Sequence, residues 1–115
     1  MVSDLEDCVR IAREAGVADD KIILDPGVGF GKTYEMNLEI TNHVDILHQL
    51  GCPVLLGTSR KSMIGLTLDL PATDRVEGTL ATTVIGVMKG CSFVRVHDIK
   101  ENYRIIQMTE AILSR

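Results

Sequence analysis

Apolar positions repeat in two ways along the chain, at helical spacing in some segments and as short unbroken runs in others. From Leu5 onward, apolar residues recur every three or four positions until Gly16, which predicts a helix over 3–15. Ser3 and Glu6 have the spacing of a capping box, in which each side chain satisfies a backbone N–H at the helix start. Ser3 is therefore expected to cap the first helix.

Short runs of β-branched and aliphatic residues predict three strands. The first run, over 21–26, ends in Pro and Gly and has the composition of a strand buried on both faces. The second and third strands are predicted at 53–57 and 92–96.

A helical pattern follows each predicted strand. After the first two strands we expect a helix over 35–50 and a short helix capped by Ser62. A further helix is predicted over 74–89, capped by Thr73 or Asp74. The last helix is predicted to be capped by Asp98 with Glu101 and to pack through Tyr103, Ile106 and Ile112. The chain is therefore one helix followed by three strand–helix units of roughly 30 to 40 residues, the size of a βαβ element. Because parallel crossovers wind in one sense, this order predicts an α/β fold, either a βα barrel or a doubly wound sheet.

Composition and charge exclude several classes of protein. The chain has 115 residues, 45% hydrophobic and 24% charged, which is the balance of one globular domain or of part of a larger one. The net charge of −4 argues against a nucleic-acid partner, because neutralising phosphates requires a basic surface. The apolar stretches are too short to cross a bilayer and no secretory leader opens the sequence, so no membrane segment is expected.

The cysteines indicate the cellular compartment. Cys8, Cys52 and Cys91 are odd in number, widely spaced and form no CxxC motif. This pattern favours buried thiols in a reducing cytoplasm over disulfides or a zinc site. His43 and His48 are five positions apart on a predicted helix, which is not metal-ligand spacing, and are interpreted as surface residues.

Polar residues gather where each predicted strand ends. The first strand is followed by the glycine-rich segment 25–33, the second by 59–62, and the third carries Arg95, His97 and Asp98. In α/β proteins, ligands bind outside the carboxyl ends of parallel strands. We therefore expect the three clusters to converge on one crevice.

The glycine-rich segment resembles two nucleotide-binding motifs without matching either. A Walker A loop requires Gly where Pro26 stands, and a dinucleotide fingerprint requires Gly where Lys32 stands. A nucleotide loop and a turn without a ligand remain alternatives. The favoured interpretation is a mobile loop whose backbone approaches a ligand, with Phe30 as an apolar lid.

The charged residues at the strand ends suggest an anionic substrate. Asp25 either caps the turn that follows it or accepts from a ligand with adjacent N–H donors. Arg95 and His97 share one face of a strand with Phe93, and if they point inward they require an anionic partner. With Lys32 and Lys61 they predict an electropositive pocket for a phosphorylated substrate.

Taken together, these motifs resemble the carboxyl-terminal part of dihydropteroate synthases, pterin-binding enzymes with a TIM-barrel fold. The matching segments are 25–32, 59–65 and 95–98, they occur in the order and spacing of that family, and the resemblance spans essentially the whole chain. It implies that residues 1–115 form the carboxyl-terminal part of a pterin-binding domain. The implied architecture is a partial (β/α)8 barrel of about three βα units, the sixth to eighth, preceded by one helix.

The resemblance also implies a reaction and a set of substrate contacts. The reaction is condensation of 6-hydroxymethyl-7,8-dihydropterin pyrophosphate with p-aminobenzoate to give dihydropteroate and pyrophosphate. The implied roles are Asp25 and Lys61 on the pterin, Ser62, Gly29 and Phe30 on p-aminobenzoate, Arg95 and His97 on pyrophosphate, and Lys61, Arg95 and His97 in catalysis. Mg²⁺ is expected on the pyrophosphate, with its protein ligand in the amino-terminal half of the family and none within this chain. A homodimer is a further implication.

A complete barrel has about 250 residues, more than twice the length of this chain. We therefore expect that the chain does not reach the turnover of the family on its own. Two alternatives remain, a fragment of a pterin-dependent methyltransferase and a non-catalytic interaction fragment.

Overall fold

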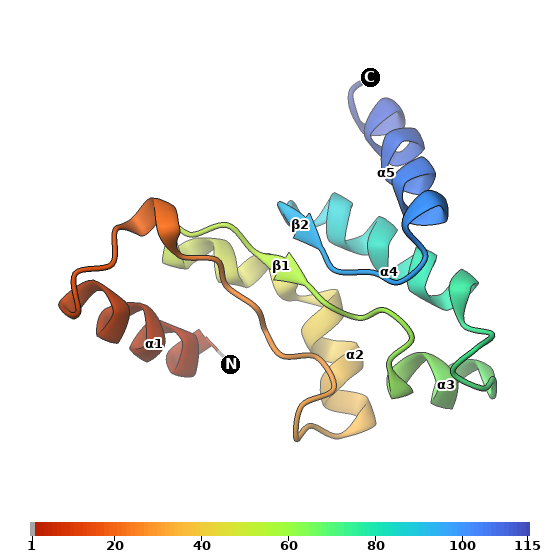
Figure 1. The fold of residues 1–115 in the computed structure, drawn as a ribbon, viewed down its shortest axis with the longest axis horizontal. Helices are drawn as coiled ribbons and strands as arrows, with labels where there is room; N and C mark the ends of the chain where they lie inside the picture. The colour runs from red at the N-terminus through yellow and green to blue at the C-terminus, as the bar shows by residue number, and fades with distance from the viewer. Residues whose placement is uncertain (1) are drawn as a thin grey trace.

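The computed structural model describes residues 2–115. It holds three parallel extended segments and the helices that connect and cover them (Figure 1). The elements are α1 (Val2–Glu14), η1 (Asp19–Lys21), α2 (Tyr34–Asn42), η2 (Val44–Leu50), β1 (Leu55–Leu56), α3 (Ser62–Leu68), α4 (Val76–Met88), β2 (Phe93–Val94) and α5 (Ile99–Leu113).

The predicted order of strands and helices is confirmed, but the strands are shorter than expected. β1 and β2 pair in parallel, with Leu55 opposite Phe93. The first predicted strand is reduced to Leu24, which forms a parallel bridge to Val54. The ladder therefore runs from the segment around Leu24, through β1, to β2. The described chain as a whole measures 43 × 36 × 21 Å along its principal axes, the dimensions of an open, flattened unit.

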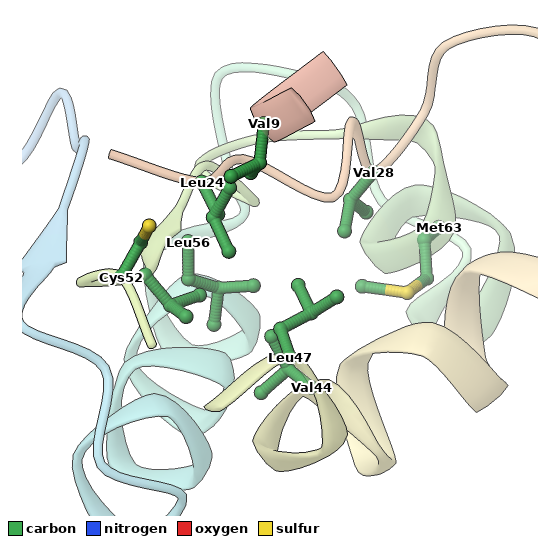
Figure 2. Close-up of a cluster of buried hydrophobic side chains, with 9 residues drawn as sticks. Val9, Leu24, Val28, Val44, Leu47, Cys52, Leu56 and Met63 are labelled. Atoms are coloured by element: carbon green, nitrogen blue, oxygen red, sulfur yellow. The ribbon is translucent and has the colours of Figure 1, made fainter. Parts of the chain in front are cut away.

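One face of this small sheet forms the hydrophobic core. Leu24, Val54 and Leu56 point to the same side, where they meet Val44 and Leu47 of η2, and all five are at most 3% exposed (Figure 2). The core is completed by Val9 of α1 and by a further set of buried side chains, Val28, Cys52 and Met63.

The opposite face of the sheet is open, which corrects the expectation of burial on both sides. Side chains alternate along a strand, so Ile23 and Phe93 point away from the core, and they are 50% and 47% exposed. Arg95 and His97 follow on the same face as Phe93 and are also exposed. They are therefore not inward-facing residues of a buried strand within residues 2–115, because no further layer in this part of the chain covers that face.

The helices are located correctly, and Asp98 does occupy the cap position of α5, but the other three predicted caps are wrong. Ser3 already lies inside α1. Ser62 is the first residue of α3, whose cap position is taken by Lys61. Arg75 precedes α4 in place of Thr73 or Asp74, and Asp98 precedes α5 without making a side-chain capping bond. The cap is set by the backbone conformation of the flanking residue, which the local sequence specifies weakly.

The predicted helix over 35–50 is in fact two elements. Thr33 caps α2 by accepting from the Met36 N–H at 3.2 Å. The α-helix ends at Asn42, because His43 leaves the helical region with φ −119° and ψ 24°, and a 3₁₀ segment continues to Leu50. This change of direction is what places Val44 and Leu47 against the sheet.

The contact of the last helix with α4 includes a buried polar pair, and only one of the three apolar residues predicted to pack it is half-buried. Tyr103 and Ile112 are 61% and 60% exposed, which contradicts that prediction, whereas Ile106 is half-buried. The contact centres on Asn102, which is 1% exposed and whose Oδ1 accepts from the Thr83 hydroxyl at 2.6 Å.

Removing the Thr83 hydroxyl is expected to weaken the α4–α5 contact. Thr83→Val keeps the shape of the side chain but leaves the buried Asn102 Oδ1 without its donor, so it should lower the free energy of unfolding by on the order of 1 kcal/mol. Thr83→Ser keeps the hydroxyl and should cost clearly less. Urea unfolding followed by circular dichroism compares the two variants; equal losses would contradict a role for this hydrogen bond.

The cysteines and two of the histidines differ in environment. Cys52 is buried, Cys91 is half-buried, and Cys8 is exposed, so the expectation of buried thiols fails for Cys8. Burial raises the pKa of the Cys91 thiol. His43 and His48 are exposed, as expected, and His48 Nε2 contacts the Lys89 carbonyl at 2.7 Å. Among residues 2–115, no helix has both the length and the apolar character needed to cross a membrane.

Candidate functional site

The ends of three neighbouring strands carry an acidic residue, a glycine and a basic residue. The acidic and basic side chains meet over the glycine, which lies between them. Asp25 follows the first extended segment, Gly57 follows β1 and Arg95 follows β2, all on the open face of the sheet. Arg95 Nη2 lies 3.8 Å from Asp25 Oδ2. A Cβ on Gly57 would lie 2.9 Å from Arg95 Nη2. The φ of Gly57 is not in the left-handed region, so glycine serves here to leave space for Arg95 to cross the middle strand.

Lys61 lies beside this pair and holds the glycine-rich loop. Its Nζ donates to the Val28 carbonyl at 2.8 Å and lies 4.2 Å from the centre of the Phe30 ring, a cation–π contact. Gly29 has φ +89°, a conformation that favours glycine, and a Cβ there would lie 3.1 Å from Lys61 Cδ, so the Lys61 side chain would have to shift slightly. Partial burial and the nearby Arg95 charge lower the pKa of Lys61, and Asp25 acts in the opposite direction.

The pKa of Lys61 is expected to report on its neighbours. Arg95→Gln removes a like charge and should raise that pKa, whereas Asp25→Asn removes an opposite charge and should lower it further. Arg104→Gln, an exposed change of the same charge on α5, should have no effect. Titration of the Lys61 side-chain NMR signal measures all three; shifts of the same sign for Arg95→Gln and Asp25→Asn would contradict the observed grouping.

The glycine-rich loop is fixed by its own side chains. Asp25 Oδ1 accepts from the Gly27 N–H at 2.8 Å, the turn-capping bond that was the alternative interpretation of this residue. Lys32 Nζ donates to the carbonyls of Gly27 and Phe30 at 3.0 and 3.3 Å. Lys32 therefore stabilises the loop and is not part of the pocket lining, which corrects the expectation that it lines the pocket.

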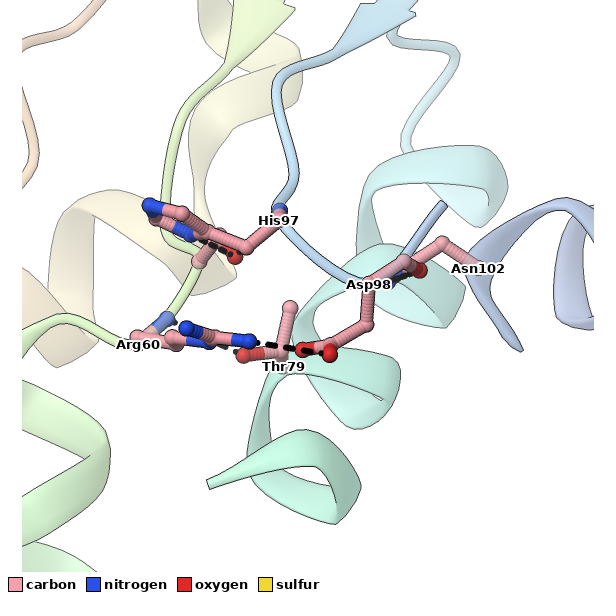
Figure 3. A network of polar contacts seen from close by, with 6 residues as sticks. Arg60, Thr79, His97, Asp98 and Asn102 are labelled. Atoms are coloured by element: carbon pink, nitrogen blue, oxygen red, sulfur yellow. Dashed lines mark hydrogen bonds and ion pairs between the residues drawn. The ribbon is translucent and has the colours of Figure 1, made fainter. Parts of the chain in front are cut away.

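The turn after β1 connects to the end of β2 by a network of polar contacts (Figure 3). Ser59 Oγ contacts His97 Nδ1 at 2.8 Å, and Arg60 Nη2 pairs with Asp98 Oδ1 at 3.0 Å. Arg60 has φ +57°, a conformation that non-glycine residues rarely adopt, and its N–H donates to Thr79 Oγ1 at 3.1 Å. The strained turn is therefore held from two sides.

Two residues that the sequence did not single out position the predicted ones. Arg75 donates to the carbonyls of Arg60 and Lys61 at 2.9 and 3.3 Å. Asn37 is 3% exposed, and its Oδ1 accepts from the Gly29 N–H at 2.9 Å. Neither residue lies in a recognisable motif; a buried amide within an amphipathic helix was the one available signal for Asn37.

The polar clusters enclose a small hollow of about 120 Å³. It is lined by Gly57, Ser59, Lys61, Arg95, Val96 and His97. A typical small-molecule cleft has about 300–1,000 Å³, so this hollow has room for only part of such a ligand, and its cations suit an anionic part. The predicted convergence is thus observed for Lys61, Arg95 and His97 in the lining, and Asp25 adjoins it through Arg95. Larger depressions of about 480 and 520 Å³ lie beside α5 and α1, away from these residues.

Ser62 and Phe30 lie outside the lining of the hollow. Ser62 is exposed at the start of α3, and Phe30 is 66% exposed on the glycine-rich loop. Phe30 is connected to the hollow through its contact with Lys61. The role of Phe30 as an apolar lid stays a prediction.

The donor set of the hollow is unsuited to a divalent cation. Mg²⁺ prefers oxygen ligands, whereas the charged groups that line the hollow are cationic, and Asp25 is not part of that lining. Among residues 2–115, no group of three or more His, Cys, Asp or Glu side chains could hold a metal ion. Residues of the hollow therefore do not fit as ligands of Mg²⁺.

Comparison with known proteins identifies relatives over the whole chain. The family described as pterin binding enzyme matches residues 1–97. The chain is 60% identical to a dihydropteroate synthase of Clostridium beijerinckii and 54% identical to one of Bacillus subtilis, in each case over 100% of the chain. It spans 43% and 40% of the length of these relatives.

The solved structures that align with this chain also include dihydropteroate synthases. A dihydropteroate synthase of Clostridium difficile, crystallised in the presence of pteroic acid, aligns with a TM-score of 0.92 and 48% identity over 96% of this chain and 43% of its own. A Yersinia pestis dihydropteroate synthase in complex with a sulfonamide drug aligns with a TM-score of 0.95 and 39% identity, over 98% of this chain and 41% of its own.

Proposed function

The chain belongs to the family of pterin-binding enzymes, and from this premise we propose that it carries part of the active site of a dihydropteroate synthase. The proposed reaction joins 6-hydroxymethyl-7,8-dihydropterin pyrophosphate to p-aminobenzoate and releases pyrophosphate. The observation that carries the proposal is the grouping at three strand ends: Lys61 and Arg95 line one hollow, and Asp25 lies beside it, 3.8 Å from Arg95.

The proposed contacts of the pterin use Asp25 and Lys61. The carboxylate of Asp25 is acceptor-only and can take two parallel N–H bonds from the amino group and ring of a pterin. Its distance of 3.8 Å from Arg95 is too long for a close ion pair, so the carboxylate remains available to a ligand. Lys61 would donate to the carbonyl side of the pterin after releasing the Val28 carbonyl.

The proposed contacts of p-aminobenzoate use Gly29, Phe30 and Ser62. Gly29 and Phe30 lie on the loop that Lys61 holds, and they would line the slot for the aromatic ring. Ser62 is exposed at the first turn of α3, where its hydroxyl and the backbone N–H groups can receive a carboxylate.

Arg95 and His97 are proposed to bind the pyrophosphate and, with Lys61, to assist its departure. In the reaction the amine nitrogen forms a bond to the methylene carbon of the pterin, the bond from that carbon to the pyrophosphate oxygen breaks, and the amine loses a proton. Negative charge therefore grows on the leaving group. Fixed cations and N–H donors around the hollow stabilise that charge more in the transition state than in the ground state.

The proposed context follows from the same family. Residues 1–115 would be the carboxyl-terminal part of a pterin-binding domain, with the three strand–helix units as the sixth to eighth of a (β/α)8 barrel. Mg²⁺ would contact pyrophosphate oxygens rather than residues of the hollow. Homodimer formation, a cytoplasmic location and reduced activity of the isolated chain stay predictions.

The alternative of a pterin-dependent methyltransferase is less well supported. That reaction has no pyrophosphate to bind, so it offers no reason for Arg95, Lys61 and His97 to line one hollow. A non-catalytic interaction role likewise does not explain why these three residues line one hollow.

Ligand discrimination tests the proposal. By isothermal titration calorimetry the chain should bind 6-hydroxymethyl-dihydropterin pyrophosphate at least about tenfold more tightly than methyltetrahydrofolate, because charge-assisted hydrogen bonds to phosphate are the strong contacts of the site. Equal binding, or tighter binding of methyltetrahydrofolate, would favour the methyltransferase. Binding of neither compound would favour the interaction fragment.

A further inference from the structure

Ser59 and His97 are connected twice through a single oxygen atom. The backbone N–H of His97 donates to Ser59 Oγ at 3.0 Å, and the same Oγ lies 2.8 Å from His97 Nδ1. Ser59 is 7% exposed, so protein surrounds most of its side chain, and it adjoins the hollow.

The hydrogen atoms available around Ser59 Oγ determine which atom is the donor in its bond with His97 Nδ1. The Ser59 hydroxyl has one hydrogen to give, and in the described part of the chain its only acceptor partner is His97 Nδ1. If Nδ1 carried a proton, two N–H groups would point at Oγ and the buried hydroxyl hydrogen would have no acceptor, which is unfavourable. The hydroxyl therefore donates to Nδ1, and the proton of the neutral ring resides on Nε2.

We propose that Ser59 is a positioning residue that holds His97 in the Nε2–H tautomer, so that the ring presents a hydrogen-bond donor to a phosphoryl oxygen in the hollow. The identity of this ligand rests on the proposed function, whereas the tautomer rests on the geometry alone. Nε2 lies across the ring from Nδ1, on the side turned away from Ser59, and His97 is part of the lining of the hollow.

The other groups of the hollow make this tautomer the useful one. Lys61 and Arg95 can only donate, and a diphosphate presents only acceptor oxygens. In the opposite tautomer, Nε2 would present a lone pair to those oxygens and repel them. Ser59 thus completes a set of donors without adding a further charge.

The tautomer can be measured directly by NMR with ¹⁵N-labelled histidine at mildly alkaline pH. The chain has three histidines, and His48 supplies an internal reference, because the Lys89 carbonyl only accepts and so requires the Nε2–H form. We expect long-range ¹H–¹⁵N correlations of His97 to show the same pattern as His48. A His97 ring protonated on Nδ1, or an even mixture of both forms, in the unmodified chain would overturn the proposal.

Variants at position 59 test whether the Ser59 hydroxyl determines the tautomer of His97. Ser59→Ala should shift His97 toward a mixture of tautomers, whereas Ser59→Thr keeps the hydroxyl and should retain the Nε2–H form. An unchanged pattern in a folded Ser59→Ala chain would overturn the role of Ser59. If Ser59→Ala does not fold, the comparison of the unmodified chain with Ser59→Thr decides, because loss of the Nε2–H pattern in folded Ser59→Thr would contradict control by the hydroxyl.

Inorganic pyrophosphate tests the donor at Nε2 independently. The amide nitrogen of Gln reaches the position of Nε2 and that of Asn the position of Nδ1, so His97→Gln should bind pyrophosphate roughly three- to tenfold more tightly than His97→Asn, the value of one hydrogen bond. Equal or reversed affinities would overturn the proposal. If the unmodified chain shows the Nε2–H tautomer but does not bind pyrophosphate, the role of Ser59 is supported and the proposed function fails.

Discussion

Replacing Arg95 with Gln should weaken binding of pterin pyrophosphate by about 10- to 100-fold, because hydrogen bonds to charged groups contribute about 1.5–3 kcal/mol. Arg95 is the cation that spans from β2 toward Asp25 and also lines the hollow. Gln keeps part of the length and polarity of the side chain but removes the charge. Isothermal titration calorimetry of the two chains at the same ionic strength measures the difference.

Arg104→Gln is the matched control for this experiment. Arg104 lies exposed on α5, so its replacement changes the net charge of the chain equally without touching the hollow. The affinity of Arg104→Gln should stay within about twofold of the unmodified chain, since Arg104 is exposed to solvent and is not part of the lining, so its charge is screened by salt. Equal losses in both variants would show that only net charge matters and would remove Arg95 from the proposed site.

Gly78→Ala should be destabilising, with a net loss of up to about 2 kcal/mol in the free energy of unfolding. A Cβ on Gly78 would lie 2.2 Å from Ile64 Cγ2, so α4 and α3 would have to separate. Overpacking of this kind costs about 1–3 kcal/mol or more and outweighs the gain of about 1 kcal/mol from the helix propensity of Ala. Urea unfolding gives the difference.

A second substitution shows whether the clash is the cause. Ile64→Ala removes Cγ2 and should itself destabilise the core, since Ile64 is 4% exposed. In that background, Gly78→Ala should cost clearly less than in the unmodified chain, because the 2.2 Å contact is gone and only contacts of 3.2 and 3.3 Å remain. Additive losses in the double variant would mean that the contact between Gly78 and Ile64 does not explain the effect.

The sequence predicts the order of elements well because that order is carried by local patterns. Helical spacing locates α1 and α5, and the short apolar runs locate the strands. Burial of the first strand on both faces is wrong because residues 2–115 cover one face of the sheet, which no local pattern reveals; Ile23 is therefore exposed. The predicted caps at Ser3 and Ser62 are wrong because a cap depends on the backbone conformation of its neighbours.

The charged residues of the candidate site could be predicted, but the residues that position them could not. Asp25, Lys61 and Arg95 are charged groups at strand ends, which the sequence makes visible. Gly57 acts by leaving space for Arg95, and Arg75 acts on carbonyls 14 and 15 positions earlier. Such contacts depend on tertiary distances and leave no motif in the sequence.

NMR chemical-shift mapping tests the central claim most directly, because it asks whether the three strand ends bind one ligand. When 6-hydroxymethyl-dihydropterin pyrophosphate is added to the ¹⁵N-labelled chain, the amide signals of Asp25, Lys61 and His97 should shift together along one saturation curve with one dissociation constant. Shifts in only one of the three clusters, or separate curves with different constants, would contradict a shared site.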